Sequence, residues 1–274
     1  MAGLSMTNKE YRDKEGMSST QIKRMSKSMA YFKYCEDNPE EDSPALLFGR
    51  AYHKWVLEPS DFYTEFAVAP NCDRRTKEGK ATWNTFVEES EGKDVIPEDM
   101  FEQICDMRDV LYSTPFAKKL LFGEHEKSFF WEDDGTGIVC KCRPDSYSKI
   151  GNQNIVVDLK TTTNAETQAF MRDAIKFGYD IQAAHYTQGM KANTGNDFEF
   201  IFVAQEKTAP YCVNILQADE YFMQSGAETR SELLKQYIEC LERDEWPAYM
   251  GFNDEAEISS LGVPNWIMNT LGSE

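Results

Sequence analysis

The sequence reads Cys-Lys-Cys-Arg-Pro-Asp over residues 140–145 and Asn-Ile-Val-Val-Asp-Leu-Lys over residues 154–160. The β-branched run Ile155–Val157 is typical of a buried strand, and the residues between the two stretches, through Gly151, read as turn-rich. Each stretch thus reads as a strand that ends in an acidic residue. This pair of stretches decides which fold the chain adopts.

The acidic ends of these stretches are expected to meet. Side chains alternate between the two faces of a strand, so Asp158 and Lys160 lie on the same face. Asp145 ends the strand-like run before the turn, so a hairpin would return it beside Asp158. The sequence therefore predicts two carboxylates and one amine at one edge of a sheet.

This set of side chains suits phosphodiester hydrolysis. Asp145 and Asp158 offer the hard oxygen ligands that Mg²⁺ prefers, and the backbone carbonyl of Leu159 is a third candidate ligand. Lys160 can stabilise negative charge on a phosphate or, if neutral, accept a proton from water, and the sequence does not separate these roles. The alternative is structural, with Asp158 and Lys160 in a salt bridge at a strand end and Asp145 capping a turn.

Four ordered motifs accompany these residues: Gly-Arg-Ala-Tyr-His at 49–53, Arg-Pro-Asp at 143–145, Asp-Leu-Lys-Thr-Thr at 158–162, and Gly-Tyr-Asp-Ile-Gln-Ala-Ala-His-Tyr at 178–186. From about residue 18 to about residue 249, the chain resembles the RecE-type exonuclease domain (exodeoxyribonuclease VIII). That domain is a branch of the PD-(D/E)XK nuclease superfamily. The ordered set is more specific than any of its members.

The order of expected elements agrees with this resemblance. Helices over 18–32, 43–57, 81–90 and 97–112 precede strands over 128–132, 138–143 and 154–160. Helices over 164–177 and 180–192, strands over 198–205 and 211–216, and a helix over 219–242 follow. We expect an α/β fold with a PD-(D/E)XK nuclease core, a mixed central sheet flanked by helices, and an N-terminal helical elaboration. Residues 1–16 lack periodicity and are expected to be flexible, and residues 17–274 to form a single exonuclease domain.

The resemblance also assigns further site residues. It implies that His53 binds the metal with Asp145 and Asp158, although a lone helical histidine is more often structural. Glu126 matches an acidic position that helps to build the site, and its alternative role is a solvated charge. Gln182 and Tyr186, four residues apart on one helical face, would look into the site, with ordinary packing as the alternative for Tyr186. We expect His185 to be structural and His125 to be exposed.

Several residues are candidates for contacts with DNA phosphates. The best basic patch lies in a polar segment followed by Trp83, and it could equally be a solvated loop. Hydroxyl groups after the catalytic strand could bind phosphates or simply end the strand. The candidates are Arg50, Arg74, Arg75, Lys77, Lys80, Arg143, Thr161 and Thr162.

The charge of the chain, −18, argues against a non-specific nucleic-acid coat, because DNA affinity comes largely from phosphate neutralisation. Residues 216–274 carry twelve acids and three bases, which is half of the excess. The rest of the chain is only mildly acidic, so a local basic path with metal ions can still hold DNA. The charge therefore weakens the expectation of a DNA substrate without removing it.

The cysteines and the hydropathy bound the cofactors and the location. Seven scattered cysteines suit reduced thiols better than a disulfide framework. Cys140 and Cys142 lack a second pair, so we expect no iron–sulfur cluster and no zinc, with Mg²⁺ as the metal and Mn²⁺ as a substitute. No stretch reaches the ~18–20 apolar residues of a membrane span, and no signal peptide is apparent. We expect a cytoplasmic protein that does not bind membranes.

The resemblance implies a specific activity. It predicts digestion of linear double-stranded DNA from its ends, 5′ to 3′, leaving 3′ single-stranded tails for recombination by strand annealing. It also implies a homo-oligomeric ring, expected to be a tetramer, a RecT-like single-strand annealing partner, and a phage or prophage origin in a bacterial host. The alternatives are an endonuclease or nickase on the same core and a non-catalytic DNA-binding module.

Overall fold

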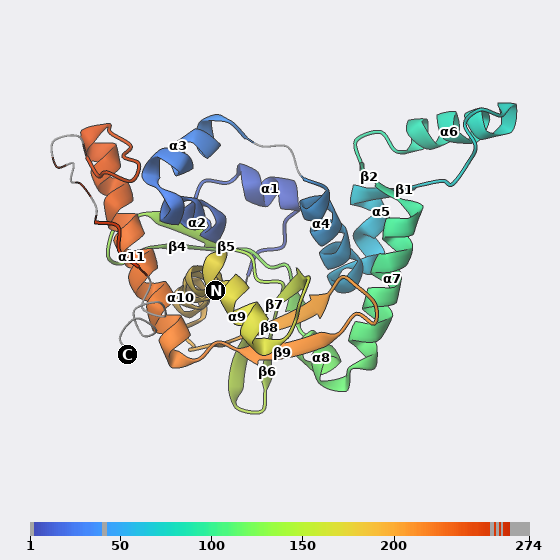
Figure 1. Cartoon of the computed structure of the whole chain (residues 1–274). Helices are drawn as coiled ribbons and strands as arrows, with labels where there is room; N and C mark the ends of the chain where they lie inside the picture. The colour runs from blue at the N-terminus through green and yellow to red at the C-terminus, as the bar shows by residue number, and fades with distance from the viewer. Residues whose placement is uncertain (1–2, 40–42, 253–254, 256–257, 259, 264–274) are drawn as a thin grey trace, which may run out of the picture.

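The computed structural model describes residues 3–39, 43–252, 255, 258 and 260–263. A central sheet lies between two groups of helices (Figure 1). Its strands follow the order β3-β6-β7-β8-β9. Their bounds are Glu124–His125 (β3), Ser146–Ile150 (β6), Gln153–Thr162 (β7), Glu199–Glu206 (β8) and Val213–Gln217 (β9). Only β7 and β8 are parallel, so the sheet is mixed, as expected.

The strand β7 separates two hydrophobic cores by simple alternation. Val156 points into one core, whereas Ile155, Val157 and Leu159 point into the other. A strand buried on both faces reads as the continuous apolar run that the sequence shows here. Because Asp158 and Lys160 share the parity of Val156, they face the first core.

Two groups of helices cover the two faces. The first core is covered by α2 (Ser19–Lys27), α3 (Met29–Asp37), α9 (Thr167–Lys176), α10 (Tyr179–Thr194) and α11 (Glu220–Arg243). The second is covered by α4 (Pro44–Leu57), α5 (Phe62–Glu65), α7 (Glu98–Ser113) and α8 (Pro115–Leu120), with a short 3₁₀ turn at Pro59–Asp61. None of the helices in the described part of the chain is long and apolar enough to cross a membrane.

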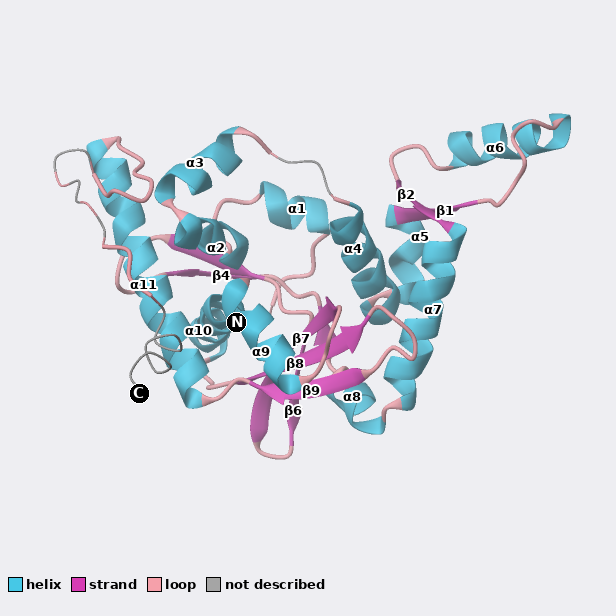
Figure 2. Ribbon diagram, in the orientation of Figure 1, coloured by secondary structure: helices cyan, strands magenta, loops and turns pink. Residues whose placement is uncertain are grey.

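Two small sheets complete the fold. The antiparallel pair β4 (Phe129–Glu132) and β5 (Val139–Cys142) packs into the first core. The parallel pair β1 (Phe66–Ala69) and β2 (Asp94–Pro97) carries α6 (Lys77–Glu89) between its strands. In Figure 2, α6 projects away from the body of the molecule, and we refer to residues 70–93 as the α6 arm.

Most expected elements form with shifted ends, but four strands in the described part of the chain, β1, β2, β3 and β6, were not predicted, and Ser28 divides the helix expected over 18–32 into α2 and α3. Residues 146–150 form β6 and pair with β7, whereas the sequence had suggested only turns there. Asn164 does not cap α9; its side chain accepts from the Glu166 N–H, and Glu166 is the cap. The helix expected from residue 180 begins at Tyr179, after Gly178 in the left-handed conformation (φ 65°).

The N-terminal segment contains regular structure. Residues 1–16 were predicted to be flexible, but α1 (Asn8–Asp13) forms there, with Thr7 and Glu10 in a reciprocal capping box. Leu4 pairs with Ser128, and the next residue after the segment, Met17, pairs with Cys140. The sequence signal for this helix is the Thr-x-x-Glu spacing, because the Thr7 and Glu10 side chains accept hydrogen bonds from two backbone N–H groups that are free at the helix start.

Candidate active site

The two aspartates meet at the sheet edge, as predicted, but through a different strand. Ser146 of β6 pairs with Val157 of β7, so Asp145, one residue earlier, lies level with Asp158. The Leu159 N–H donates a 2.6 Å hydrogen bond to Asp145 Oδ2. This bond fixes the Asp145 carboxylate against the end of β7. The proposed metal contact of the Leu159 carbonyl stays a prediction.

A histidine and two carboxylates converge beside this edge. His53, Glu126 and Asp145 each place one ligand atom within 4.8 Å of the other two. His53 Nδ1 lies 3.4 Å from Asp145 Oδ1. These three side chains come from α4, from the segment after β3 and from the residue before β6. An imidazole nitrogen and carboxylate oxygens form a donor set that accepts Mg²⁺ or Mn²⁺.

The helix α4 holds His53 in place through its buried face. Phe48, Tyr52 and Val56, spaced four residues apart, are buried in the second core. Burial of side chains of this size stabilises a fold by roughly 1.5–3 kcal/mol each. His53 follows Tyr52 and is turned toward the pocket. A Cβ on Gly49, one turn before His53, would meet no atom within 4 Å, so this side of the imidazole is open.

Glu126 is held by a buried ion pair. Its backbone adopts φ 50°, a left-handed conformation that costs a non-glycine residue about 1–2 kcal/mol. Arg143 Nε donates to Glu126 Oε2 at 2.5 Å, and Arg143 Nη1 donates to the Met6 carbonyl at 2.8 Å. Strain of this kind persists where the surroundings fix it, often at functional sites. Glu126 is therefore a positioned side chain rather than a solvated charge.

The pKa values record a concentration of buried negative charge. Burial raises the pKa of Glu126 to about 7, and the Asp145 carboxylate adds to the effect. Burial also raises the pKa of Asp158. Burial alone would lower the pKa of His53, but the neighbouring Asp145 carboxylate outweighs burial, and the pKa of His53 is raised. For Asp145, His53 overcomes the effect of burial and lowers the pKa.

The residues fit a divalent cation. Asp158 Oδ2 is buried, and the Lys160 ammonium lies 2.5 Å away as its ion-pair partner. Glu126 and Asp145 add two further carboxylates beside this pair, and carboxylates gathered in this way repel one another unless a cation joins them. The oxygens of three carboxylates and a nitrogen of one histidine lie at this sheet edge, and together they are suitable ligands for a divalent ion. The candidate ligands are His53, Glu126, Asp145 and Asp158.

Lys160 and Gln182 form the second half of the site. Gln182 Nε2 donates to Asp158 Oδ1 at 2.6 Å, and Lys160 Nζ donates to Gln182 Oε1 at 3.4 Å. Burial alone would lower the pKa of Lys160, but Asp158 raises it. The amine is therefore protonated at neutral pH, which favours charge stabilisation over proton acceptance.

Tyr186 lies one turn after Gln182 and is partly buried. Its ring lies 6.3 Å from that of Phe200, so it packs in the first core. Burial is the main cause of its raised pKa, and the charges of Asp158 and Asp145 contribute to it. The phenol thus serves packing and lies within electrostatic reach of the carboxylates.

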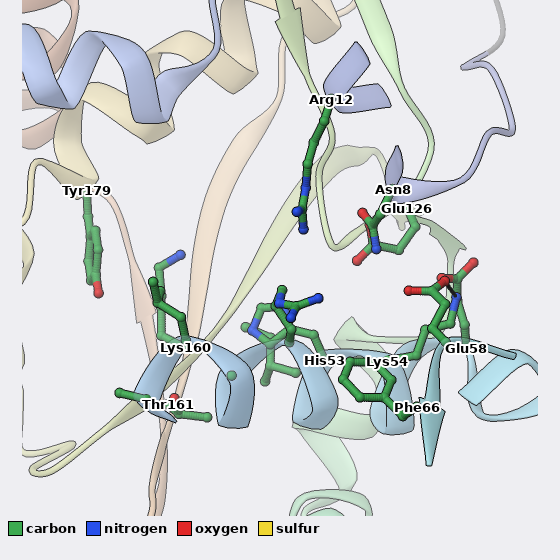
Figure 3. A pocket seen from close by; sticks show the side chains of 16 residues that line it. Asn8, Arg12, His53, Lys54, Glu58, Phe66, Glu126, Lys160, Thr161 and Tyr179 are labelled. Atoms are coloured by element: carbon green, nitrogen blue, oxygen red, sulfur yellow. Dashed lines mark hydrogen bonds and ion pairs between the residues drawn. The ribbon is translucent and has the colours of Figure 1, made fainter. Parts of the chain in front are cut away.

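A pocket of about 350 Å³ lies between α4, the end of β7 and α1, and His53, Glu126 and Lys160 are among the residues that line it. Figure 3 shows Arg12 of α1 reaching into it from the side opposite His53, with Asn8 beside Glu126 and with Tyr179 beside Lys160. The sequence reasoning missed Asn8, Arg12 and Tyr179. Their only signal was the N-terminal capping box and the position of Tyr179 within the last motif.

The predicted DNA contacts near the pocket divide into two groups. Arg50 and Thr161 line the pocket, and Arg50 also pairs with Asp94 at 2.8 Å. Arg143 and Thr162 are buried, which contradicts a direct contact with DNA. The guanidinium of Arg143 is used to hold Glu126, and the Thr162 hydroxyl bonds the backbone of Asn164.

The four other predicted contacts lie on the α6 arm. Arg74 stacks on the Trp83 ring at 4.2 Å, and Arg75 pairs with Asp73 at 3.0 Å. Lys77 and Lys80 are exposed on α6. Figure 1 shows α6 projecting away from the strands that carry the carboxylates. The structure therefore does not bring these residues into the pocket.

The other two histidines differ in outcome. His185 is structural, as predicted: it is buried, its Nε2 lies 3.0 Å from the Lys141 carbonyl, and its Nδ1 accepts from Arg230. His125 was predicted to be exposed, which is wrong. Its ring nitrogens lie 2.9 Å and 2.6 Å from the carbonyls of Leu57 and Leu121, so it ties α4 to α8 beside β3.

Comparisons with known proteins agree with this geometry. A family profile described as a PDDEXK-like domain of unknown function (DUF3799) matches residues 18–257. A solved structure from Eubacterium rectale, described as a "putative exonuclease", is similar with a TM-score of 0.64 at 17% identity, covering 99% of this chain and 100% of that one. A second solved structure, named SSO0001, has a TM-score of 0.31 at 14% identity, covering 73% of this chain and 86% of that one, which is too low a similarity to support a shared fold. No curated protein matches the sequence.

The residues of the superfamily motif lie within the region that the family profile matches. Pro144-Asp145 and Asp158-Leu159-Lys160, which carry the letters of the superfamily's name, lie together at one edge of the mixed sheet. The matched region spans most of the chain. Since the profile and the fold agree, this chain belongs to the PDDEXK-like family, and its fold is that of a PD-(D/E)XK nuclease domain.

Proposed function

We propose that the chain is a metal-dependent deoxyribonuclease that digests linear double-stranded DNA from its ends. The observation that carries the proposal is the convergence of His53, Glu126 and Asp145 within 4.8 Å, next to the Asp158–Lys160 pair, where His53, Glu126 and Lys160 line an open pocket. A buried structural ion-pair cluster would have no need of an open pocket above it.

The chemistry divides between a candidate ion and the residues of the chain. His53, Glu126, Asp145 and Asp158 would hold the ion, which when bound polarises a phosphate oxygen and acidifies water. The Lys160 ammonium stabilises the negative charge that develops on the attacked phosphate. Gln182 holds the Asp158 carboxylate and the Lys160 ammonium in one arrangement. Arg12, which reaches into the pocket from above, contributes a charge for binding the phosphate backbone.

The finer assignment rests on the resemblance to RecE-type exonucleases. It consists of Mg²⁺ dependence with Mn²⁺ as a substitute, 5′ to 3′ polarity, and 3′ single-stranded tails for strand annealing. A ring-shaped homo-oligomer, expected to be a tetramer, with a RecT-like partner in the cytoplasm of a phage-carrying bacterium, belongs to the same proposal. The similar fold of the Eubacterium rectale protein, described as a "putative exonuclease", agrees with this proposal of digestion from ends.

End-labelled substrates test this function. Linear duplexes labelled at the 5′ or the 3′ end are incubated with Mg²⁺, with covalently closed circular duplex as the control. We expect early release of labelled mononucleotide from the 5′ end and an intact circle. Nicking or linearisation of the circle would instead establish an endonuclease, and an absence of cleavage with Mg²⁺ and with Mn²⁺ would contradict hydrolysis altogether.

A further inference from the structure

A second lysine reaches the active site from α2. Lys23 Nζ donates to Gln182 Oε1 at 3.3 Å, the same oxygen that accepts from Lys160 Nζ at 3.4 Å. Both ammonium groups also lie near the face of Tyr179, 5.6 Å and 4.8 Å from its ring centroid. Two cations therefore share one amide oxygen and one aromatic ring at the edge of the pocket.

The position of Lys23 is fixed by its neighbours. A Cβ on Gly178 would lie 3.0 Å and 3.3 Å from the Lys23 side-chain carbons, so the lysine stem lies directly against this glycine. Gly178 also adopts φ 65°, which a larger residue rarely tolerates. The glycine that starts α10 thus leaves the room through which Lys23 reaches Gln182.

The described residues compensate the charge of Lys23 only in part, through the nearby charge of Asp158. Asp158 accepts from Gln182 and faces Lys160, and no carboxylate among the described residues forms an ion pair with Lys23. Burial and the neighbouring Lys160 together lower the pKa of Lys23 to about 8. The uncapped N-terminus of α10 adds the positive end of a helix dipole at the same place. An ammonium held in this way is destabilising until an anion joins it.

We propose that Lys23 binds a phosphate of the DNA backbone adjacent to the one that Lys160 serves, so that α2 and β7 together form a two-lysine phosphate subsite. The proposal rests on the nuclease function proposed above and names a residue that holds its substrate. Lys23 is only half-buried, and among the described residues its side chain donates one hydrogen bond, to Gln182, beside the Tyr179 ring, so an ammonium with three N–H donors can also bind phosphate oxygens.

Binding measurements on variants of the full chain test the subsite. Affinity for a labelled linear duplex is followed by fluorescence anisotropy over a series of salt concentrations. Ca²⁺, which takes the same oxygen ligands as Mg²⁺, replaces it, and intact duplex is verified on a gel. The variants are Lys23→Gln, Lys23→Arg and the matched control Lys27→Gln, one turn further along α2, where Lys27 instead covers the Tyr31 ring.

A phosphate contact and a purely structural lysine give different results. For Lys23→Gln we expect about tenfold weaker binding, and a salt slope reduced by about one unit. Lys23→Arg should retain the slope, and Lys27→Gln should match the wild type in both. The thermal midpoint of Lys23→Gln should equal or exceed that of the wild type, because the variant removes a poorly compensated charge.

Unchanged affinity and slope in folded Lys23→Gln would overturn the subsite, whatever the effect on turnover. The result is separable from the nuclease proposal. If the wild type digests linear duplex while Lys23→Gln binds normally, only the subsite fails; if the wild type cleaves no DNA, the proposed function fails first.

Discussion

The pocket at the end of β7 and the α6 arm both carry charged sequence motifs, acidic in the first and basic in the second. The two regions differ in how their charged side chains come together. Beside the pocket, residues as distant along the chain as Lys23 and Gln182 lie within hydrogen-bond distance. On the arm, Arg75 pairs with Asp73, two residues away, and Arg74 stacks on nearby Trp83. Convergence of distant segments concentrates unbalanced charge, whereas local pairing disperses it. Ligand binding and chemistry are expected where charge is concentrated.

The comparison predicts that substitutions of Lys160 and of the candidate metal ligands cause the largest losses of cleavage activity. Lys160→Ala and Asp145→Asn should each lower the rate of DNA cleavage by at least ~10³-fold, because each removes a group that acts on developing charge or on the ion. The measurement is single-turnover digestion of a linear duplex, with circular dichroism to verify folding. Cleavage near the wild-type rate in either folded variant would break the assignment of the pocket as the catalytic centre.

The histidine of the pocket should act through the metal. His53→Ala should require at least about tenfold more Mg²⁺ for half-maximal cleavage, since one candidate ligand of the ion is lost. A titration of rate against Mg²⁺ and Mn²⁺ measures this, with the wild type as the reference and circular dichroism to verify that the variant is folded. Overlapping titrations for His53→Ala and the wild type would make His53 a structural residue.

The partly compensated charge of Lys23 should give binding a pH dependence. Burial and Lys160 lower the pKa of Lys23 to about 8, so the ammonium is present below that pH and is lost above it. Lys160 and Asp158 of β7 and Tyr179 of α10 are the titratable groups that face it. Affinity for duplex should therefore fall several-fold as the pH rises from about 7 to about 9.5.

The arginine variant sharpens this prediction. Because arginine stays protonated throughout this range, Lys23→Arg should bind with nearly constant affinity from pH 7 to about 9.5. Anisotropy titrations in matched ionic strength compare the two proteins. The same pH profile in both would assign the titration to another group.

The α6 arm should give the smallest effect. Replacing Arg74, Arg75 and Lys77 with alanine should weaken duplex binding only a few-fold, with a change in salt slope well below the ~2.7 units of three full phosphate contacts. Their partners Asp73 and Trp83 already occupy two of these side chains. Salt-series anisotropy measures the slope, and cleavage at saturating DNA is the control. A loss of two or more slope units would place a DNA path on the arm and contradict the comparison.

The core of the fold follows from the sequence because its signals are local. The apolar run of β7, the hairpin β4–β5 and the amphipathic helix α11 each carry a pattern readable within a few residues. The pairing of Asp145 with Asp158 was predicted, but β5 was taken as the partner strand. The true partner, β6, has the mixed sequence Ser-Tyr-Ser-Lys-Ile, whose polar residues resemble a turn.

The rest of the site depends on contacts that no local pattern encodes. His53, Glu126 and Gln182 entered through a family resemblance, and the structure brings them together from three separate elements. No sequence signal distinguished Lys23: it is one of two lysines in α2, and only the packing of α2 against the start of α10 sets it apart. Arg143 shows the opposite case, because a basic residue beside a catalytic motif was taken for a DNA contact and is buried.

The N-terminal segment shows that the part of the chain that forms the pocket begins before the region matched by the family profile. The family profile starts at residue 18, yet Asn8 and Arg12 line the pocket and the Met6 carbonyl holds the arginine that holds Glu126. A boundary drawn from family similarity therefore divides the candidate active site and excludes part of its pocket lining. A chain started at residue 18 would keep every acidic residue of the motif and still lack one wall of the cleft. The residues ahead of position 18 are therefore part of what shapes the pocket and any ligand that it binds.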